Sequence, residues 1–509
     1  MIYGKQVEKW DVFEVAFSSK IQYANPFSDV VISAIFKTGT IQKKVYGFYD
    51  GDGTWIVRFM PEETGKYSFT ISSNNPEFDM KNGEFESTSP SEKNHGPVNV
   101  DKTYHFSYAD GTPFFVMGTT AYAWFYRPEE IRAETLKSFE KYNFNKIRMF
   151  FPPKNYWGAD GEVNMSYEPP CYPYEGETNN FNFKKFNPEY FRNYEDRVKE
   201  LMEIGVQADV ILFHFYDFNK FGIDKMNEEE ALFFLNYIIN RLSSYRNVWW
   251  SLSNEYELFF EYETPDKPGD VSVWLDRRNW DVIGEFIKAN DPYGHPRSVH
   301  NFPNGVIYPD RPWLTHVSYQ HPNTFNLLMD LKKEYQKPVI NDEYQYEGNI
   351  RYSWGNSTPE EELYRHWMSV MAGGYATHGE VYKTESNNRD IFWTYGGKII
   401  GGSAPRLKYL KEIIESCPFQ EMNPDWRNTD GINFFSLSKG MDSFLLFFRN
   451  NLPKKNVYPG CSFAKEYKYK VEVFDVWNCK KVDEYIMEKQ GSINITEWTV
   501  VKMTNLLTL

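Results

Sequence analysis

Residues 248–258 read VWWSLSNEYEL, a run of apolar and small side chains that stops at Asn254 and Glu255. A second run, KPVINDE at residues 337–343, stops at Asp342 and Glu343. Short apolar runs of this kind are typical of strands that are buried on both faces, as in a parallel sheet. Each of these two predicted strands therefore carries an acidic side chain at its carboxyl end.

Six further apolar runs accompany these two, so that eight predicted strands follow one another at residues 114–121, 146–151, 206–213, 248–253, 297–300, 315–319, 338–342 and 373–379. Helical patterns separate most of them, for example at residues 128–142, 188–205, 227–245 and 272–290. Eight buried strands that alternate with helices favour a (β/α)8 TIM barrel over an open doubly wound sheet. The connection between the fifth and sixth strands has no helical pattern, so we expect an irregular fifth repeat.

Outside this region the apolar residues alternate with period two, which is typical of half-buried antiparallel strands. The alternating runs lie at residues 12–17, 29–36, 43–50, 54–60 and 66–73, and again at 431–438, 443–450, 467–477 and 498–503. A polar Ser/Pro/Gly stretch at 87–97 predicts a domain boundary. We therefore expect an α/β protein with an N-terminal β-sandwich at 1–97, a (β/α)8 barrel at 98–416 and a C-terminal β-sandwich at 417–509.

The composition excludes several classes of protein. The net charge is −14 and the Lys and Arg residues do not cluster, which argues against a nucleic-acid partner. No run approaches the roughly 18 apolar residues that span a membrane, and the first residues lack a signal-peptide pattern. The four cysteines are widely spaced, which argues against a disulfide scaffold or a zinc site. These features predict a cytoplasmic protein.

The two acidic strand ends carry the functional prediction. In a (β/α)8 barrel the active site lies at the carboxyl ends of the strands, and the fourth and seventh strands face each other across the mouth. Glu255 and Glu343 can therefore approach to about 5–5.5 Å, the separation that retaining cleavage of a glycosidic bond requires. We expect an oligosaccharide or glycoside substrate, with no cofactor and no metal.

Other polar and aromatic side chains also follow predicted strands. Arg148 ends the second strand and needs an acidic partner if it is buried; beside Glu343 it would lower the pKa of that carboxyl and leave Glu255 as the proton donor. His300 and His321 follow the fifth and sixth strands, and Trp124 follows the first. Each of these three residues either contacts the substrate or packs in the core.

The Asn-Glu end of the fourth strand, followed by the Glu of the seventh, resembles the clan of (β/α)8 retaining glycosidases that includes family 5. The flanking sandwiches resemble those of bacterial glycosidases with an apiosidase-like barrel. The resemblance covers the barrel. It implies double displacement, with Glu255 as acid/base and Glu343 as nucleophile.

The same resemblance implies roles for five more residues. Asn254 would bind the substrate 2-hydroxyl, Arg148 would be the arginine of the second strand, and His214 the histidine of the third. Tyr319 would donate a hydrogen bond to the nucleophile. Trp393 would form an aromatic platform near the eighth strand, although it lies farther along the chain than is usual.

Alternatives remain open at this point. A metal-dependent barrel hydrolase would need a His-x-His cluster, which the nine histidines do not form. A non-catalytic carbohydrate-binding barrel does not need a proton donor, and an inverting glycosidase would hold its carboxyls about 6.5–9.5 Å apart. Glu257 and Glu347 lie just beyond the strand ends and are weaker candidates for the catalytic pair. The sandwiches either brace the barrel or mediate homo-oligomerisation.

Overall fold

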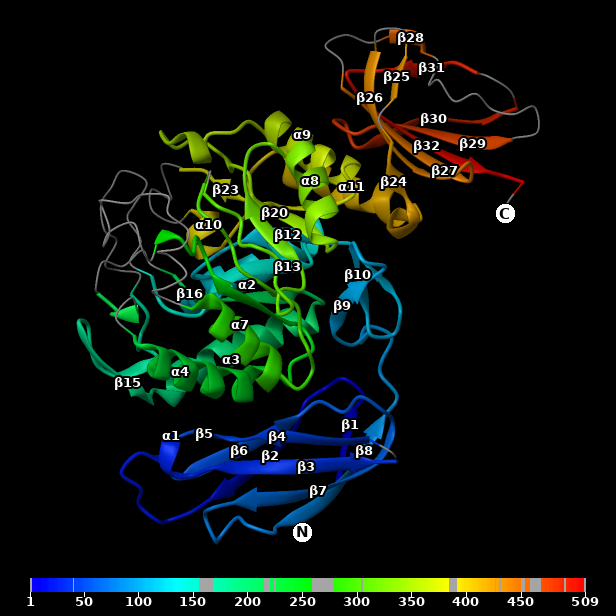
Figure 1. The fold of residues 1–509 in the computed structure, drawn as a ribbon. Coiled ribbons are helices and arrows are strands. Elements are labelled where there is room, and N and C mark those ends of the chain that lie inside the picture. The colour runs from blue at the N-terminus through cyan, green and yellow to red at the C-terminus, as the bar shows by residue number, and fades with distance from the viewer. Residues whose placement is uncertain are drawn as a thin grey trace.

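The computed structural model shows a (β/α)8 barrel with β-sheets on either side of it in the sequence (Figure 1). It describes residues 2–39, 41–154, 168–214, 220–223, 226–258, 279–303, 305–383, 391–425, 427–429, 432–449, 454–457, 468–488 and 491–507. In Figure 1 the N-terminal sheets, in blue, lie below the barrel, and the C-terminal sheets, in orange and red, lie at its upper right. The predicted fold class is confirmed.

Eight parallel strands build the barrel: β12 (Met117–Thr120), β13 (Lys146–Phe150), β16 (Gln207–Phe213), β17 (Val248–Ser253), β18 (Arg297–Ser298), β19 (Val317–Gln320), β20 (Val339–Glu343) and β22 (Tyr375–His378). Hydrogen-bonded neighbours follow the order β18-β17-β16-β13-β12-β22-β20-β19. Thr315 donates its backbone N–H to the carbonyl of Arg297 over 3.0 Å, so the two ends of this order lie side by side. The barrel is therefore nearly closed.

Helices surround the strands: α2 (Glu129–Tyr142), α3 (Pro188–Glu203), α4 (Glu228–Leu242), α7 (Trp280–Asn290), α8 (Asn326–Tyr335), α9 (Pro359–Met371) and α11 (Ala404–Glu415). Asn227 and Thr358 start α4 and α9 with capping boxes. Each cap side chain accepts a hydrogen bond from the backbone N–H of a glutamate three residues later, and the backbone N–H of the cap residue donates to the side chain of that glutamate. The described residues between β18 and β19 contain no helix, as the sequence predicts.

Two sheets face each other in the N-terminal part. One has the order β1 (Ile2–Glu8), β8 (Asn82–Thr88), β7 (Gly65–Ser73), β3 (Ile32–Thr38), β4 (Ile41–Tyr46), and the other β2 (Phe13–Ser18), β6 (Thr54–Phe59), β5 (Phe48–Tyr49). Phe13 stacks on Phe85 at 4.0 Å between ring centroids, and Phe36 stacks on Phe59 at 4.1 Å. Both pairs join one sheet to the other, so aromatic side chains form the core of this sandwich.

A buried cluster of charges fixes the N-terminal sheets against the barrel helices. Arg58 of β6 places its two terminal nitrogens 2.9 Å from the carboxylate oxygens of Glu195 in α3. Arg241 of α4 donates to the same carboxylate at 2.5 Å and lies 2.8 Å from Asp50. Burial alone would raise the pKa of Glu195, but Arg241 and Arg58 lower it to about 2, so the carboxyl is ionised and paired.

Further strands complete the molecule. A sheet that the sequence does not predict, β9 (Val98–Asp101), β10 (His105–Tyr108) and β11 (Pro113–Phe114), lies at the start of the barrel. The C-terminal part is mainly one antiparallel sheet of β24 (Asn423–Pro424), β25 (Arg427–Thr429), β26 (Ile432–Lys439), β27 (Ser443–Arg449), β32 (Trp498–Asn505), β29 (Tyr469–Asp475) and β30 (Lys480–Met487), with a small pair, β28 (Lys454–Val457) and β31 (Ile493–Ile495). Within the described residues, no helix has the length and apolar character needed to cross a membrane.

Candidate active site

A β-bulge at the end of β20 turns two consecutive acidic side chains into the barrel. Tyr319 of β19 pairs with Asn341, but the next residue, Gln320, pairs with Glu343, so Asp342 is the extra residue. Side chains normally alternate along a strand, and a bulge breaks that alternation. Asp342 and Glu343 therefore both face inward, as their partners show.

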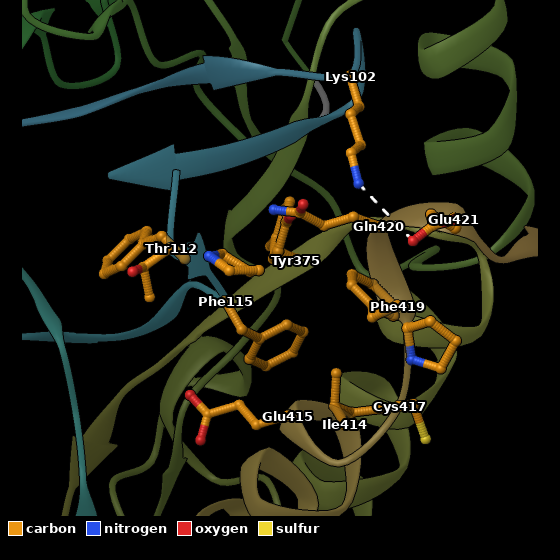
Figure 2. A pocket seen from close by; sticks show the side chains of 13 residues that line it. Lys102, Thr112, Phe115, Tyr375, Ile414, Glu415, Cys417, Phe419, Gln420 and Glu421 are labelled. Carbon is orange, nitrogen blue, oxygen red and sulfur yellow. Dashed lines mark ion pairs between the residues drawn. The ribbon is translucent and has the colours of Figure 1, made fainter. Parts of the chain in front are cut away.

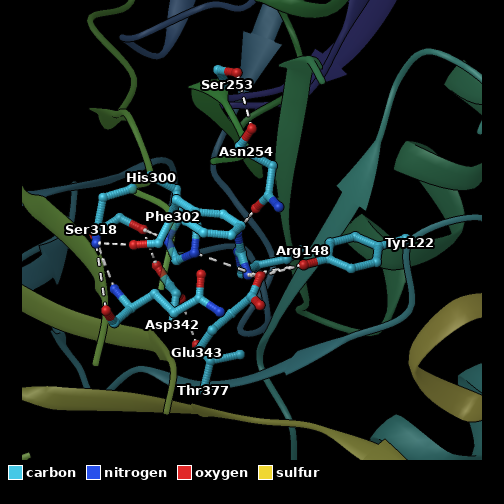
Figure 3. A network of polar contacts seen from close by, with 12 residues as sticks. Tyr122, Arg148, Ser253, Asn254, His300, Phe302, Ser318, Asp342, Glu343 and Thr377 are labelled. Carbon is cyan, nitrogen blue, oxygen red and sulfur yellow. Dashed lines mark hydrogen bonds and ion pairs between the residues drawn. The ribbon is translucent and has the colours of Figure 1, made fainter. Parts of the chain in front are cut away.

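Asp342 lies in a buried ionic cluster below the mouth (Figure 3). Its carboxylate is 3.1 Å from the Lys146 ammonium and accepts hydrogen bonds from Ser318 and Thr377, each at 2.6 Å. Burial would raise the pKa of Asp342, but Lys146 and Arg148 lower it far below its usual range. Because this carboxylate stays ionised and fully bonded, it suits a structural role rather than proton transfer.

Glu343 is held by a cation and a phenol. Its Oε1 lies 2.5 Å from the Arg148 guanidinium, accepts a hydrogen bond from the Tyr122 hydroxyl, and is 3.5 Å from His300 Nε2. Burial raises the pKa of Glu343, but Arg148, His300 and Tyr122 outweigh it, so the net pKa is lowered. This carboxyl is therefore an anion at neutral pH, the state that a nucleophile needs.

Arg148 joins the two acidic strand ends, and Figure 3 shows its side chain between them. One terminal nitrogen contacts Glu343 and the other donates to Asn254 Oδ1, directly before Glu255. The sequence-based expectation that Arg148 lies beside Glu343 thus agrees with the geometry.

Glu255 follows β17 in a left-handed backbone conformation, with φ of 46°, and its side chain is half-buried. Non-glycine residues adopt this conformation rarely and at an energetic cost. The sharp turn lets Asn254 and Glu255, although adjacent, both contribute to the mouth. The Gln320 amide nitrogen, in the amide orientation that satisfies its neighbours, lies 3.1 Å from Glu255 Oε1.

His300 belongs to this network. Its Nδ1 is 3.1 Å from the Ser318 hydroxyl, and its backbone N–H donates to Ser253 at the end of β17. Burial and then the charge of Arg148 lower the pKa of His300 to about 3. The ring is therefore neutral at neutral pH, and it contacts both carboxylate-bearing strands.

Tyr122 is a residue of the network that the sequence did not single out. Its ring stacks on Phe150 at 4.2 Å and meets Trp393 at 5.3 Å, edge to face. Its backbone N–H donates to the Trp393 carbonyl over 3.0 Å, which ties the first barrel loop to the last. Trp393 is only half-buried, as expected for a wall of the site.

Tyr319 does not make the predicted bond to Glu343; the Tyr122 hydroxyl donates to that carboxylate, and Tyr346 interacts with it as well. Ser318 points into the barrel, where it bonds to Asp342, so the next side chain, Tyr319, points outward into the hydrophobic core. Trp124 is likewise fully buried and packs against Phe139 of α2 at 6.3 Å, so it is a core residue and not a floor for sugar.

Two predicted histidines lie farther out. His214 packs on Phe150 at 4.6 Å, its Nε2 is 3.1 Å from the Pro153 carbonyl, and burial lowers its pKa to about 3. It is therefore one ring removed from Tyr122. His321 accepts a hydrogen bond from the Asn323 backbone over 2.9 Å, which ties its ring to its own turn.

Glu257 and Glu347, the two other glutamates near the strand ends, both bond to backbone N–H groups of distant loops. Glu257 accepts from the Phe302 backbone N–H at 2.7 Å, and burial raises its pKa to about 8. Glu347 accepts from the backbone N–H groups of Gly402 and Ser403, at 2.6 and 2.9 Å. Each secures a loop by bonding to a distant backbone segment.

A cavity of about 370 Å³ lies at the other end of the barrel (Figure 2). Its wall includes Phe115, Tyr375 and Phe419, and the Lys102–Glu421 ion pair, 3.8 Å long, lies at its edge. Tyr375 begins β22, so this cavity faces the amino ends of the strands. Residues at this end of a (β/α)8 barrel typically contribute to stability and not to catalysis. Within the described parts of the chain, no group of three or more His, Cys, Asp or Glu side chains could hold a metal ion.

Two protein families match parts of this chain. A family described as "Apiosidase-like, catalytic domain" matches residues 100–421, and a domain of unknown function (DUF5060) matches residues 6–74. No curated protein matches this chain.

Solved structures extend the similarity over the full length. A candidate glycoside hydrolase from Bacteroides vulgatus ATCC 8482 is 33% identical, with a TM-score of 0.85 over 98% of this chain and 100% of that chain. A family 5 glycoside hydrolase from the same organism shares the fold, at 16% identity and a TM-score of 0.60 over 81% of this chain and 93% of that one. Since the apiosidase-like match spans more than half of the sequence, the chain belongs to the apiosidase-like family and is a glycoside hydrolase.

Proposed function

We propose that this glycoside hydrolase retains anomeric configuration, with Glu343 as nucleophile and Glu255 as acid/base. The observation that carries the proposal is the pair of contacts from Arg148 and Tyr122 to Glu343. They favour the anionic form of that carboxyl, and Arg148 also reaches the residue before Glu255. One carboxyl is thereby specialised as the anion and the other is left for proton transfer.

In the first step, Glu343 attacks the anomeric carbon of the bound sugar. The contacts from Arg148, Tyr122 and His300 all end on Oε1 of Glu343, so we assign the attack to Oε2. The bond to the leaving oxygen breaks as that oxygen takes the proton of Glu255. The products are a glycosyl ester of Glu343 and a free alcohol.

In the second step, the Glu255 carboxylate takes a proton from water, and the water oxygen attacks the anomeric carbon. The ester bond breaks, Glu343 returns as a carboxylate, and Glu255 regains its proton. Two inversions restore the starting configuration. We assign Asn254 to the substrate 2-hydroxyl and Trp393 to one sugar face, as the family resemblance implies.

We propose short oligosaccharides or glycosides as substrates. The cytoplasmic location predicted from the sequence favours short chains over polymers. The half-buried Trp393, which contacts the ring that binds the nucleophile, supports a sugar bound directly above Glu343.

The test begins with a screen of aryl glycosides and plant oligosaccharides, in which NMR follows the anomer released first. Retention is expected; release of the opposite anomer would establish the inverting alternative. Glu343→Gln should lower kcat by at least about 1000-fold. For Glu343→Ala, azide should restore turnover and yield a glycosyl azide of inverted configuration.

Glu257→Gln is the matched control. Burial raises the pKa of Glu257 to about 8, so the neutral amide resembles the protonated carboxyl already present at pH 7. This variant should retain activity within a few-fold, whereas Glu255→Gln should not. Wild-type protein that binds oligosaccharides but cleaves none of the screened glycosides would favour the non-catalytic alternative.

A further inference from the structure

We propose that Gln320 is a positioning residue for the acid/base: its amide fixes the Glu255 carboxyl so that the transferable proton resides on Oε2. The proposal rests on the proposed function of Glu255. Gln320 is the last residue of β19 and was not among the residues that the sequence indicated.

The backbone around Gln320 is tied on both sides. Its N–H donates to the Asn301 side chain at 3.0 Å, and the Asn301 amide donates back to its carbonyl at 3.4 Å. The β20 bulge also aligns Gln320 with Glu343 across the ladder. These contacts hold the start of the Gln320 side chain in place at the mouth.

A backbone carbonyl determines which way the amide faces. The same end of the Gln320 amide lies 3.1 Å from the Asn301 carbonyl and 3.1 Å from Glu255 Oε1. A carbonyl oxygen only accepts hydrogen bonds, so this end must be the NH2 group. Its two hydrogens then serve the carbonyl and Glu255 Oε1, which makes Oε1 an acceptor whether or not Glu255 is protonated.

The acid proton is consequently directed to Oε2. A free carboxyl can carry its proton on either oxygen, and only one of these arrangements reaches the leaving oxygen. With Oε1 engaged by Gln320, the O–H group and, after cleavage, the accepting lone pair are both on Oε2. The hydrogen bond also stabilises the carboxylate form that must remove a proton from water.

Gln320 also lies close to the proposed nucleophile. Its side chain interacts with His300, whose Nε2 is 3.5 Å from Glu343 Oε1. The groups whose charge interacts with Glu255 include Glu257 beside it and Tyr122 across the mouth. Gln320 is thus an uncharged donor that reaches Glu255 from the side of Glu343.

Rates on substrates with different leaving groups distinguish a positioning role of Gln320 from a general structural effect of its replacement. In Gln320→Leu, kcat/KM for a phenyl or alkyl glycoside should fall about 10- to 100-fold, because expulsion of a poor leaving group needs the proton. For the 2,4-dinitrophenyl glycoside of the same sugar, kcat/KM should change less than about three-fold, because that leaving group needs no proton. Equal losses on both substrates, or no loss on either, would overturn the proposal.

A second variant tests the electrostatics. Gln320→Glu has the same shape but places an acid against Glu255, so the basic limb of the kcat/KM profile should move to higher pH. An unmoved limb would contradict the proposal. Glu255→Gln serves as the reference: if it shows no dependence on the leaving group, the acid/base assignment itself fails, independently of Gln320.

Discussion

Arg148 is the cation on which the charge distribution of the site depends. It is buried, and its two terminal nitrogens reach Glu343 and Asn254. A guanidinium suits this bridge because it offers several donors in a rigid plane, which a lysine ammonium does not. Arg148 therefore links the ionisation of Glu343, the proposed nucleophile, to the position of the fourth strand end.

Replacement of Arg148 by Met should move the acid limb of kcat/KM to higher pH, by about one to three pH units. The wild-type pKa of Glu343 is lowered, so this carboxylate, the proposed nucleophile, stays ionised into acidic solution. Without the cation the pKa rises, and activity is lost earlier as the pH falls. Arg197→Met is the control, since Arg197 pairs with Glu200 on its own helix; a limb that moves equally in both variants would refute the assignment.

Tyr122 and Tyr319 form a matched pair of variants for testing the hydrogen bond to Glu343, the proposed nucleophile. Tyr122→Phe removes a hydrogen bond to a charged group and should lower kcat/KM about 10- to 100-fold. Tyr319→Phe should leave kcat/KM within about two-fold, because its side chain points into the core. The reverse order of effects would restore the sequence-based assignment of Tyr319.

Among single residues, the sequence predicted those members of the site whose positions follow from the order of the barrel strands. Glu343 ends β20, Arg148 lies within β13 and Asn254 directly follows β17, so residue type and position in the barrel sufficed to bring them together. Tyr122 and Gln320 depend on local backbone geometry instead. A short 3-10 helix after β12 buries Trp124, and the β20 bulge changes which residue of β19 lies beside Glu343.

At the scale of elements, two short helical turns determine which tryptophan near the barrel mouth is buried and which is partly exposed. The 3-10 turn Trp124–Tyr126 buries Trp124 under α2, whereas α10 (Phe392–Tyr395) keeps Trp393 half-exposed beside Tyr122. Both tryptophans follow strands of the barrel, and only the local turn distinguishes them. Sequence periodicity does not report such turns, which explains why both were predicted as substrate contacts.

Trp393→Ala should raise KM about ten-fold with little change in melting temperature, because a half-exposed stacking surface is lost. Trp124→Ala should instead lower stability by about 3–5 kcal/mol, because it creates a cavity in the core. Steady-state kinetics on the soluble protein and thermal melting of both variants measure the difference. A rise in KM for Trp124→Ala alone would contradict this division.

The elements themselves follow the sequence closely where apolar runs are long. The predicted strands coincide with the barrel, and the irregular fifth repeat is present. The β9–β11 sheet was missed, since its strands are only two to four residues long and carry too little periodicity to detect. The division of the chain at residues 97 and 416 stays a prediction.

At the scale of the whole molecule, the Arg58–Glu195–Arg241 cluster is a buried set of ion pairs that joins the N-terminal sheets to the barrel. Glu195→Gln leaves two buried arginines without their shared partner and should cost about 3–5 kcal/mol of unfolding free energy. Chemical denaturation measures this cost. Glu203→Gln, at the exposed end of the same helix, should change stability by less than about 0.5 kcal/mol.

The same cluster predicts a pH dependence. The pKa of Glu195 is about 2 in the folded protein against an ordinary value of 4.5, so its stabilisation is complete above pH 4.5 and is lost as the pH falls towards 2. The stability difference between wild type and Glu195→Gln should therefore narrow over that interval. A difference that stays constant down to pH 2 would show that Glu195 does not titrate with folding.

The Arg58–Glu195–Arg241 cluster also has a consequence for the order of events during synthesis, because its residues leave the ribosome at different times. Arg58 and Arg241 are 183 residues apart, so at about 5–20 residues per second the ribosome needs roughly 9–37 s to deliver the second after the first. During that interval the N-terminal sheets have emerged, and Arg58 can pair with Glu14 of β2 but not yet with Glu195 of α3. Until α3 and α4, the second and third helices of the barrel, have been synthesised and have packed, this face of the N-terminal sheets stays exposed to water or to a chaperone.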